Sequence, residues 1–388
     1  MKLQIEPKYD AFREEVRAWL KEALPADMAA RTLQCYHTTI EDRRAWSKTL
    51  AAKGWAGPAW PKEYGGPGWA EWQVMIFEEE CYLAGTPMVD EAGFKLCAPV
   101  IWTFGTDEQK ARWLPPLLAG DQYWGQGFSE PNAGSDLASL STRCVRVGDE
   151  YVINGTKIWT TDVHYADLIF CLVKTDPEAK QRGISFVVVD AKDPGVTIRP
   201  IIDIGEGHSL NEVFLDNVRI PADWLIGEEN KGWSYGKFLL DNERAYSAEI
   251  PRNKRTLARV KALARETGII EDEGFALRIA DAESDLSALE FMTLRAMAEK
   301  AEGTNFPVGS ILKIRGTELL QKLGALQVEA LGPYGAVVYP HEETNDMPPG
   351  PAIGHGVLAD FMYRRAVTIY GGSNEIQRTI IAKSYLEL

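Results

Sequence analysis

Four short segments of the chain carry residue types and spacings that could do chemistry. The first, FSEPNAGSDLASL (128–140), is rich in hydroxyls and small residues. Its Gly134, Ser135 and Asp136 offer backbone N–H groups and a hydroxyl that suit contacts with phosphate, ribityl or carbonyl oxygens. The alternative is an ordinary interdomain loop in which Asp136 caps a short helix. This segment alone does not decide between the two.

The second segment, KIWTTD (157–162), places an aromatic plane beside a hydroxyl. Trp159 and Thr161 are two residues apart, so on a strand both side chains would face the same side. An indole can cover a flat heterocycle while the hydroxyl bonds to polar atoms at the heterocycle's edge. On its own, the same pattern also fits a core tryptophan and a surface threonine.

The third segment, YGGSNEIQR (370–378), has two glycines before a predicted helix. Gly371 and Gly372 would let a ligand approach the backbone closely. The alternative is a glycine-rich turn, with Ser373 as helix cap and Glu375 in the first turn.

The fourth segment, FLLDNER (238–244), holds a carboxylate that could act as a general base. Its helical spacing places Glu243 on a largely apolar face, where burial would raise the pKa of the carboxyl. Arg244 points about 100° away around the helix, so it is free to meet a phosphate or carboxylate. The alternative is a surface helix with ion pairs. The neighbours of Glu243 at three, four or seven residues are Leu239, Leu240, Tyr246, Ser247 and Ile250.

The composition excludes several classes of protein. The 388 residues are 45% hydrophobic and 25% charged, as expected of a globular protein of two or three domains. The net charge of −14 argues against binding to nucleic acid or to an anionic membrane. The five cysteines and five histidines lack the spacing of a disulfide framework or a metal site. The start has no apolar leader and no apolar run is long enough to span a membrane, which predicts a cytoplasmic protein.

The elements that must position these segments change type twice along the chain. Helical periodicity predicts a helical domain over 1–122, short strands predict a β domain over 123–226, and helices return over 227–388. Within the β domain, YVINGTKIWTT (151–161) is predicted to form a hairpin at Asn154-Gly155.

The segments, in this order, resemble the acyl-CoA dehydrogenase family across nearly the whole chain. AWPKEYGG, GQGFSEP and FLLDNER resemble the bacterial branch that includes pimeloyl-CoA and steroid side-chain dehydrogenases. The resemblance implies an α+β fold with an N-terminal helical domain, a small β-barrel or sandwich and a C-terminal four-helix bundle. It also implies a non-covalent FAD between the β domain and the bundle, with an acyl-CoA substrate on the opposite face of the flavin.

The resemblance also implies roles for individual residues. Ser129 and Thr161 would bond to the flavin's polar edge and Trp159 would cover its face, whereas Ser135 would lie near the CoA. The other residues implied to contact the FAD are Phe128, Gly372, Ser373 and Glu375.

The base is displaced from its commonest position in the family. Many members carry a carboxylate where this chain has Gly371, which cannot accept a proton. Isovaleryl-CoA and long-chain dehydrogenases instead carry a Glu on a bundle helix immediately before an Arg, and Glu243-Arg244 matches that arrangement. The resemblance thus implies Glu243 as the base and Arg244 as a substrate contact. The N–H of Gly371 would polarise the thioester carbonyl, and the missing side chain would admit a branched or ring-bearing acyl group.

Two family features are missing. Residues 268–283 lack the Arg-x-x-Phe-Gly segment, and the later Gly-Gly-Asn-Gly is replaced by Gly-Pro-Tyr-Gly at 332–335, where an irregular stretch (332–356) begins. Both features serve the FAD of a neighbouring subunit, so we expect either a homo-oligomer that binds FAD by other residues or a heteromer with a second acyl-CoA dehydrogenase-like subunit. The leading hypothesis is dehydrogenation to a 2,3-enoyl-CoA with electrons passed to an electron-transfer flavoprotein. A flavin monooxygenase or oxidase and a structural partner subunit remain alternatives.

Overall fold

The computed structural model describes residues 7–34, 38–246, 248–301, 308–338, 349–386 and 388. The chain folds into two compact units, each built from more than one stretch of sequence. Unit 1 comprises Met1–Asp42, Trp69–Pro87 and Arg244–Leu388, and unit 2 comprises Arg43–Gly68 and Met88–Glu243. The unit boundaries fall inside helices α3 (Ile40–Lys53) and α7 (Gly232–Tyr246) as well as between elements. No described helix is both long enough and apolar enough to cross a membrane.

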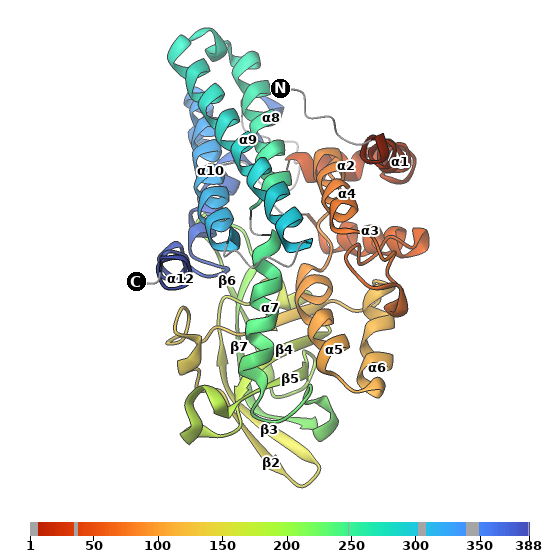
Figure 1. Cartoon of the computed structure of the whole chain (residues 1–388). Helices are drawn as coiled ribbons and strands as arrows, with labels where there is room; N and C mark the ends of the chain where they lie inside the picture. The colour runs from red at the N-terminus through yellow and green to blue at the C-terminus, as the bar shows by residue number, and fades with distance from the viewer. Residues whose placement is uncertain (1–6, 35–37, 247, 302–307, 339–348, 387) are drawn as a thin grey trace. The chain divides into compact units, whose positions relative to one another are not determined.

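Unit 2 is built on one seven-stranded sheet (Figure 1). Strands pair in the order β1-β4-β2-β3-β7-β6, and β5 pairs with β4. Strands β4 and β5 are apolar along most of their length and almost entirely buried, so this pair lies in the core of the unit. The strands are β1 (Trp124–Gly127), β2 (Arg143–Val147), β3 (Glu150–Lys157), β4 (Leu168–Lys174), β5 (Ile184–Asp190), β6 (Val196–Ile201) and β7 (Leu210–Pro221), and the other helices of the unit include α5 (Ala98–Phe104) and α6 (Asp107–Leu118).

The hairpin predicted at Asn154-Gly155 is wrong. Strand β3 runs through both residues, and the hairpin turn lies earlier, at Gly148 and Asp149 between β2 and β3. Gly148 has a φ of 65°, in the region that favours glycine. Gly155 instead marks a shift of register between β3 and β7, and a Cβ there would lie 2.5 Å from Thr142 Oγ1. This glycine therefore permits a close approach between segments and makes no turn.

Unit 1 is helical, and its core lies among three long helices that run side by side in Figure 1. These are α8 (Ile250–Thr267), α9 (Glu273–Ala301) and α10 (Val308–Ala330). Their apolar faces meet in a buried cluster that includes Val260, Phe275 and Leu323. Helix α4 packs against α8 and helix α12 packs against α10. The remaining helices of the unit are α1 (Pro7–Ala23), α2 (Ala26–Gln34), α4 (Glu71–Ala84), α11 (Val357–Tyr363) and α12 (Asn374–Tyr385).

The helical stretch predicted to continue to Ile250 is divided in two. Helix α7 ends at Tyr246 and α8 begins at Ile250, after Glu249 with a φ of 51°. Pro251 lies in the first turn of α8, where proline is favoured because those N–H groups have no intrahelical partner. Ile250 therefore does not share a helix with Glu243, and Ser247 lies outside the described residues.

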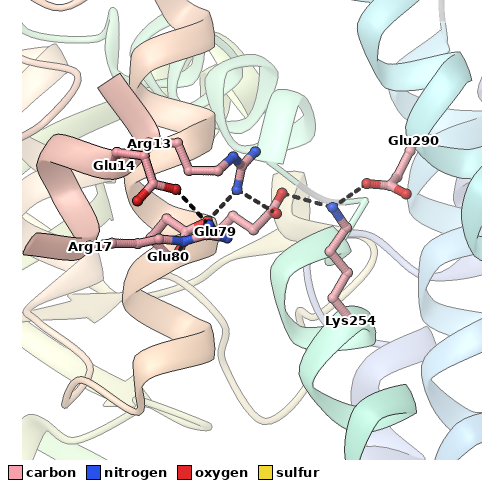
Figure 2. A network of polar contacts seen from close by, with 7 residues as sticks. All are labelled: Arg13, Glu14, Arg17, Glu79, Glu80, Lys254 and Glu290. Atoms are coloured by element: carbon pink, nitrogen blue, oxygen red, sulfur yellow. Dashed lines mark hydrogen bonds and ion pairs between the residues drawn. The ribbon is translucent and has the colours of Figure 1, made fainter. Parts of the chain in front are cut away.

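A polar network ties α1, α4, α8 and α9 of unit 1 together (Figure 2). Arg13 of α1 donates to Glu79 at 2.9 Å and also to Glu80, both of which are buried on α4. Lys254 of α8 donates to Glu79 at 2.9 Å and pairs with Glu290 of α9. The buried carboxylates are thus matched by cations, as burial of a charge requires.

Candidate active site

Two loops of unit 2 lie side by side where β1 and β3 end. One begins at Phe128, directly after β1, and the other begins at Ile158, directly after β3. The N–H of Ile158 donates to the carbonyl of Ser129 at 2.9 Å, so the loops remain paired beyond the strands. Ser129, Trp159 and Thr161, all predicted from the sequence, therefore lie on two paired loops of unit 2.

A buried ion pair fixes these two loops. Lys157, the last residue of β3, donates from Nζ to Glu130 Oε1 at 2.7 Å and to the carbonyls of Leu172 at 2.7 Å and Phe128 at 3.3 Å. The side chains of Lys157 and Glu130 are 0% and 4% exposed. Burial acts to raise the pKa of Glu130, but the Lys157 ammonium and the donors of the 141–142 segment lower it to about 2. This pair was not predicted from the sequence.

Trp159 and Thr161 do not lie on a strand, contrary to the prediction. Strand β3 ends at Lys157, and Trp159 has a φ of 59°, which is rare for a bulky residue. Its side chain is 56% exposed, and Thr161 is exposed as well. Thr160 between them is buried, and its hydroxyl has no hydrogen-bond partner among the described residues. Such a backbone outlier, holding a large aromatic ring outward, is characteristic of a ligand-binding loop.

The inner side of this loop is anchored by a second buried ion pair that the sequence analysis also missed. Asp162, with a φ of 53°, accepts a hydrogen bond from Arg43 Nη1 at 2.6 Å. The same Nη1 donates to the hydroxyl of Tyr123 at 3.1 Å, and the N–H of Asp162 donates to the carbonyl of Ser209 at 2.6 Å. Contacts on the protein side therefore determine the loop's conformation and leave the Trp159 ring exposed.

The other predicted residues of the 128–142 loop have different environments. The Phe128 side chain is buried and packs edge-on against Phe170, at 5.7 Å between ring centroids, so any ligand contact from Phe128 would come from its backbone. Ser135 is exposed. Asp136 makes no side-chain capping bond to the following short helix, so the alternative interpretation of this residue as a cap is wrong.

The glycine-rich turn before α12, in unit 1, combines both features expected from the sequence. Gly371 and Gly372 have φ values of 65° and 83°, a conformation that glycine adopts readily. Ser373 caps α12 by accepting a backbone N–H of the first turn at 3.3 Å, and Glu375 is exposed in that turn. Gln377 Nε2 donates to both glycine carbonyls at 3.3 Å, which holds the turn against its own helix.

Glu243 and Arg244 lie in the last turn of α7, and their side chains are outside the described residues. Helix α7 is fixed in unit 2 by Phe104, whose ring stacks on Tyr235 at 4.3 Å and meets Phe238 edge-on at 5.2 Å. The unit boundary falls between Glu243 and Arg244. The structure thus brings Ser129, Trp159 and Thr161 together in unit 2 and, separately, Gly371 to Glu375 in unit 1.

Similarity to known proteins shows to which family these loops and helices belong. The chain matches the family models for the acyl-CoA dehydrogenase N-terminal domain over residues 6–121, the middle domain over 125–218 and the C-terminal domain over 230–386. The chain belongs to the acyl-CoA dehydrogenase family. A relative from Mycobacterium tuberculosis, acyl-CoA dehydrogenase IpdE1, is 35% identical, with 98% of this chain and 97% of that protein covered. Acyl-CoA dehydrogenase FadE29 of the same organism is 32% identical, with coverage of 100% and 99%.

Solved structures of acyl-CoA dehydrogenases share the fold. The Tcur3481-Tcur3483 steroid acyl-CoA dehydrogenase has a TM-score of 0.89 at 31% identity, with 100% of this chain and 99% of that chain covered. The ChsE4-ChsE5 complex from Mycobacterium tuberculosis has a TM-score of 0.84 at 31% identity, with the same coverage. The predicted family and fold class are confirmed. The protein is an oxidoreductase of the acyl-CoA dehydrogenase type, and members of this family are FAD flavoproteins.

The described residues of unit 2 fit an FAD. An isoalloxazine needs a flat apolar surface and hydrogen-bonding groups at its edge. The exposed indole of Trp159 and the exposed Thr161 supply both from one loop, and the adjoining loop adds Ser129. The unsatisfied, buried hydroxyl of Thr160 is a further polar group at the same place.

Proposed function

We propose that the protein converts an acyl-CoA thioester to its 2,3-enoyl-CoA with a non-covalent FAD. The observation that carries the proposal is Trp159, whose exposed indole is held by a left-handed backbone beside Thr161. When bound, the FAD supplies the acceptor for the hydride that leaves Cβ. Ser129 and Thr161 would bond to the flavin's polar edge, and Trp159 would cover its face.

The α-proton requires a base, to which we assign Glu243. Gly371, at the position where many family members carry the base, has no side chain. Glu243 precedes Arg244, as in the members that carry the base on this helix. A carboxylate can accept the α-proton, which glycine cannot.

The remaining assignments concern the substrate's carbonyl and its CoA. The backbone N–H of Gly371 would donate to the thioester oxygen and stabilise the negative charge that builds on it as the α-proton leaves. Arg244 and Ser135 would contact the CoA portion or the substrate's polar groups. Gly372, Ser373 and Glu375 would lie against the FAD.

Anaerobic flavin bleaching tests this function. We expect a saturating acyl-CoA to reduce the bound FAD without oxygen and to leave as the 2,3-enoyl-CoA, identified by mass. Electron-transfer flavoprotein should then reoxidise the enzyme quickly and oxygen slowly. Rapid reoxidation by oxygen would indicate an oxidase. A flavin that stays oxidised with straight, branched and ring-bearing acyl-CoAs alike would contradict the dehydrogenase assignment.

We further propose that a second, acyl-CoA dehydrogenase-like subunit completes the enzyme. The similar structure from Mycobacterium tuberculosis is a ChsE4-ChsE5 complex. Residues 268–283 and 332–335 of this chain also lack the sequences with which family members bind a neighbour's FAD. We expect the chain alone to bind little FAD, and co-expression with a homologous subunit to give a larger, flavin-loaded assembly by sedimentation. A fully loaded homo-oligomer of this chain would contradict a heteromer.

A further inference from the structure

Three arginines of unit 1 gather around one tyrosine and the segment after α11. Arg252 and Arg255 of α8 both lie over the Tyr82 ring of α4, with Cζ 5.7 and 5.6 Å from the ring centroid. Arg364 lies close enough that its charge, together with that of Arg252, adds to burial in lowering the pKa of Arg255. Three like charges are thus held together in a partly buried place.

The carboxylates of this cluster are already paired. Glu249 Oε2 lies 3.3 Å from Arg252 Nε, and Asp360 Oδ1 accepts from Arg364 Nε at 3.0 Å. The next arginine along α8, Arg259, donates to two backbone carbonyls. Among the described residues, these three arginines, together with Arg259, whose charge also acts on Asp360, face the two carboxylates, so positive charge is in excess.

Of the three arginines, Arg255 is the one with no ion-paired carboxylate among the described residues, since Asp360, whose charge also acts on it, is bonded to Arg364. Within the described part of the chain, its contact with the Tyr82 ring is its one hydrogen-bond, ion-pair or ring contact. The residue before it is different, because Lys254 is matched by Glu79 and Glu290 (Figure 2). A partly buried guanidinium beside two like charges is costly unless an anion joins it.

We propose that Arg252, Arg255 and Arg364 form a carboxylate-binding site, and that its ligand is a carboxylate at the far end of the substrate's acyl group. This assignment rests on the proposed function. An anion would offset the excess positive charge, and a guanidinium can bind a carboxylate with two parallel N–H bonds. The cluster also adjoins the proposed thioester contact along the chain. Arg364 donates to the Tyr370 hydroxyl at 3.3 Å, and Tyr370 directly precedes Gly371.

The test measures binding of enoyl-CoA products to the FAD-loaded enzyme, with its partner subunit where one is needed. Products bind without reducing the flavin, so calorimetry reports affinity alone. The probes are pairs of trans-2-enoyl-CoAs of graded length, which end in either a methyl group or a carboxylate. In the parent we expect the carboxylate member of at least one pair to bind about 10–100-fold more tightly, as charge-assisted hydrogen bonds allow.

Variants of α8 locate the effect. Arg255→Gln should abolish the preference while the methyl-ended probes bind as before, and Arg255→Lys should keep part of it because the charge remains. Arg265→Gln removes an exposed arginine of the same helix and should keep the preference intact. The Glu243→Gln protein should keep it too, so loss of the proposed base does not imitate loss of this site.

Two results would overturn the proposal. The first is a parent enzyme that shows no preference for the carboxylate in any pair. The second is an Arg255→Gln protein in which both members of each pair weaken equally, because the arginines would then be meeting phosphates of the CoA. Thermal unfolding of Arg255→Gln and Arg265→Gln, run in parallel, confirms that both variants are folded when they are titrated.

Discussion

Replacing Glu243 by glutamine should slow flavin reduction by an acyl-CoA about 10²–10⁴-fold, the range of general-base contributions. The amide keeps the size of the side chain but cannot accept the α-proton. Because that proton is only weakly acidic, we expect the loss to approach the upper end of the range. FAD and acyl-CoA should still bind, since neither depends on proton transfer. Stopped-flow absorbance under anaerobic conditions measures the rate directly.

Two further variants test whether the loss comes from proton acceptance by Glu243. Glu243→Asp should retain part of the rate, because the carboxylate is withdrawn by one methylene but still accepts a proton. Asp241→Asn is the matched control, since it removes a carboxylate two positions earlier in α7 and should leave reduction unchanged. A Glu243→Gln rate within about threefold of the parent would be too small a loss for a general base, and the base would then belong to another residue.

The fold class could be predicted from the sequence because it depends on the order of elements. Helical and strand periodicities change at two points, and three domains of one family follow that order. The strand connections could not be predicted in the same way. Asn154-Gly155 is a strong local turn signal, yet the pairing of β3 with β7 and the closeness of Thr142 make Gly155 part of a continuous strand. Gly148, with a weaker signal, makes the turn.

For the loop at 158–162, the functional residues could be predicted from the sequence but their backbone conformation could not. Trp159 and Thr161 were predicted from the chemistry of their side chains, although the strand expected to carry them was wrong. Their conformation was not predicted, because it depends on Asp162 and Arg43, which are 119 positions apart in the chain. The residues next to Asp162 in the sequence do not indicate a contact with so distant a residue.

One feature of the sequence does indicate the Lys157–Glu130 pair. Lys157 ends a strand in which Tyr151 and Ile153 are buried, so a lysine there is a charge near core positions. Buried lysines need a partner, and Glu130 lies in the segment 128–140, which is one of the four segments with candidate functional residues. The sequence does not show the other two hydrogen bonds of Lys157 Nζ, which go to the backbone carbonyls of Leu172 and Phe128.

Replacing Lys157 by methionine should therefore destabilise the protein by about 3–5 kcal/mol, the usual result of leaving one buried charge without its partner. Methionine fills similar space but supplies none of the three Nζ bonds, so Glu130 must become neutral or remain unpaired. The loops that carry Ser129 and Trp159 should loosen, and FAD should bind more weakly. Denaturant unfolding measures the first effect and flavin content the second. Since the pKa of Glu130 is lowered to about 2 from an ordinary 4.5, the loss should be full above pH 4.5 and shrink as pH falls towards 2.

Lys192 provides the matched control for this prediction. Its Nζ lies 2.7 Å from Asp167 Oδ1, the same separation as in the buried pair, but its side chain is 73% exposed. Lys192→Met should cost at most about 1 kcal/mol, because water replaces the lost partner. The double variant with Lys157→Met and Glu130→Gln should recover part of the stability lost by Lys157→Met alone, since no charge is left buried. Equal losses for Lys157→Met and Lys192→Met would mean that burial adds nothing to the pair, and the ion pair could not then be what fixes the two loops.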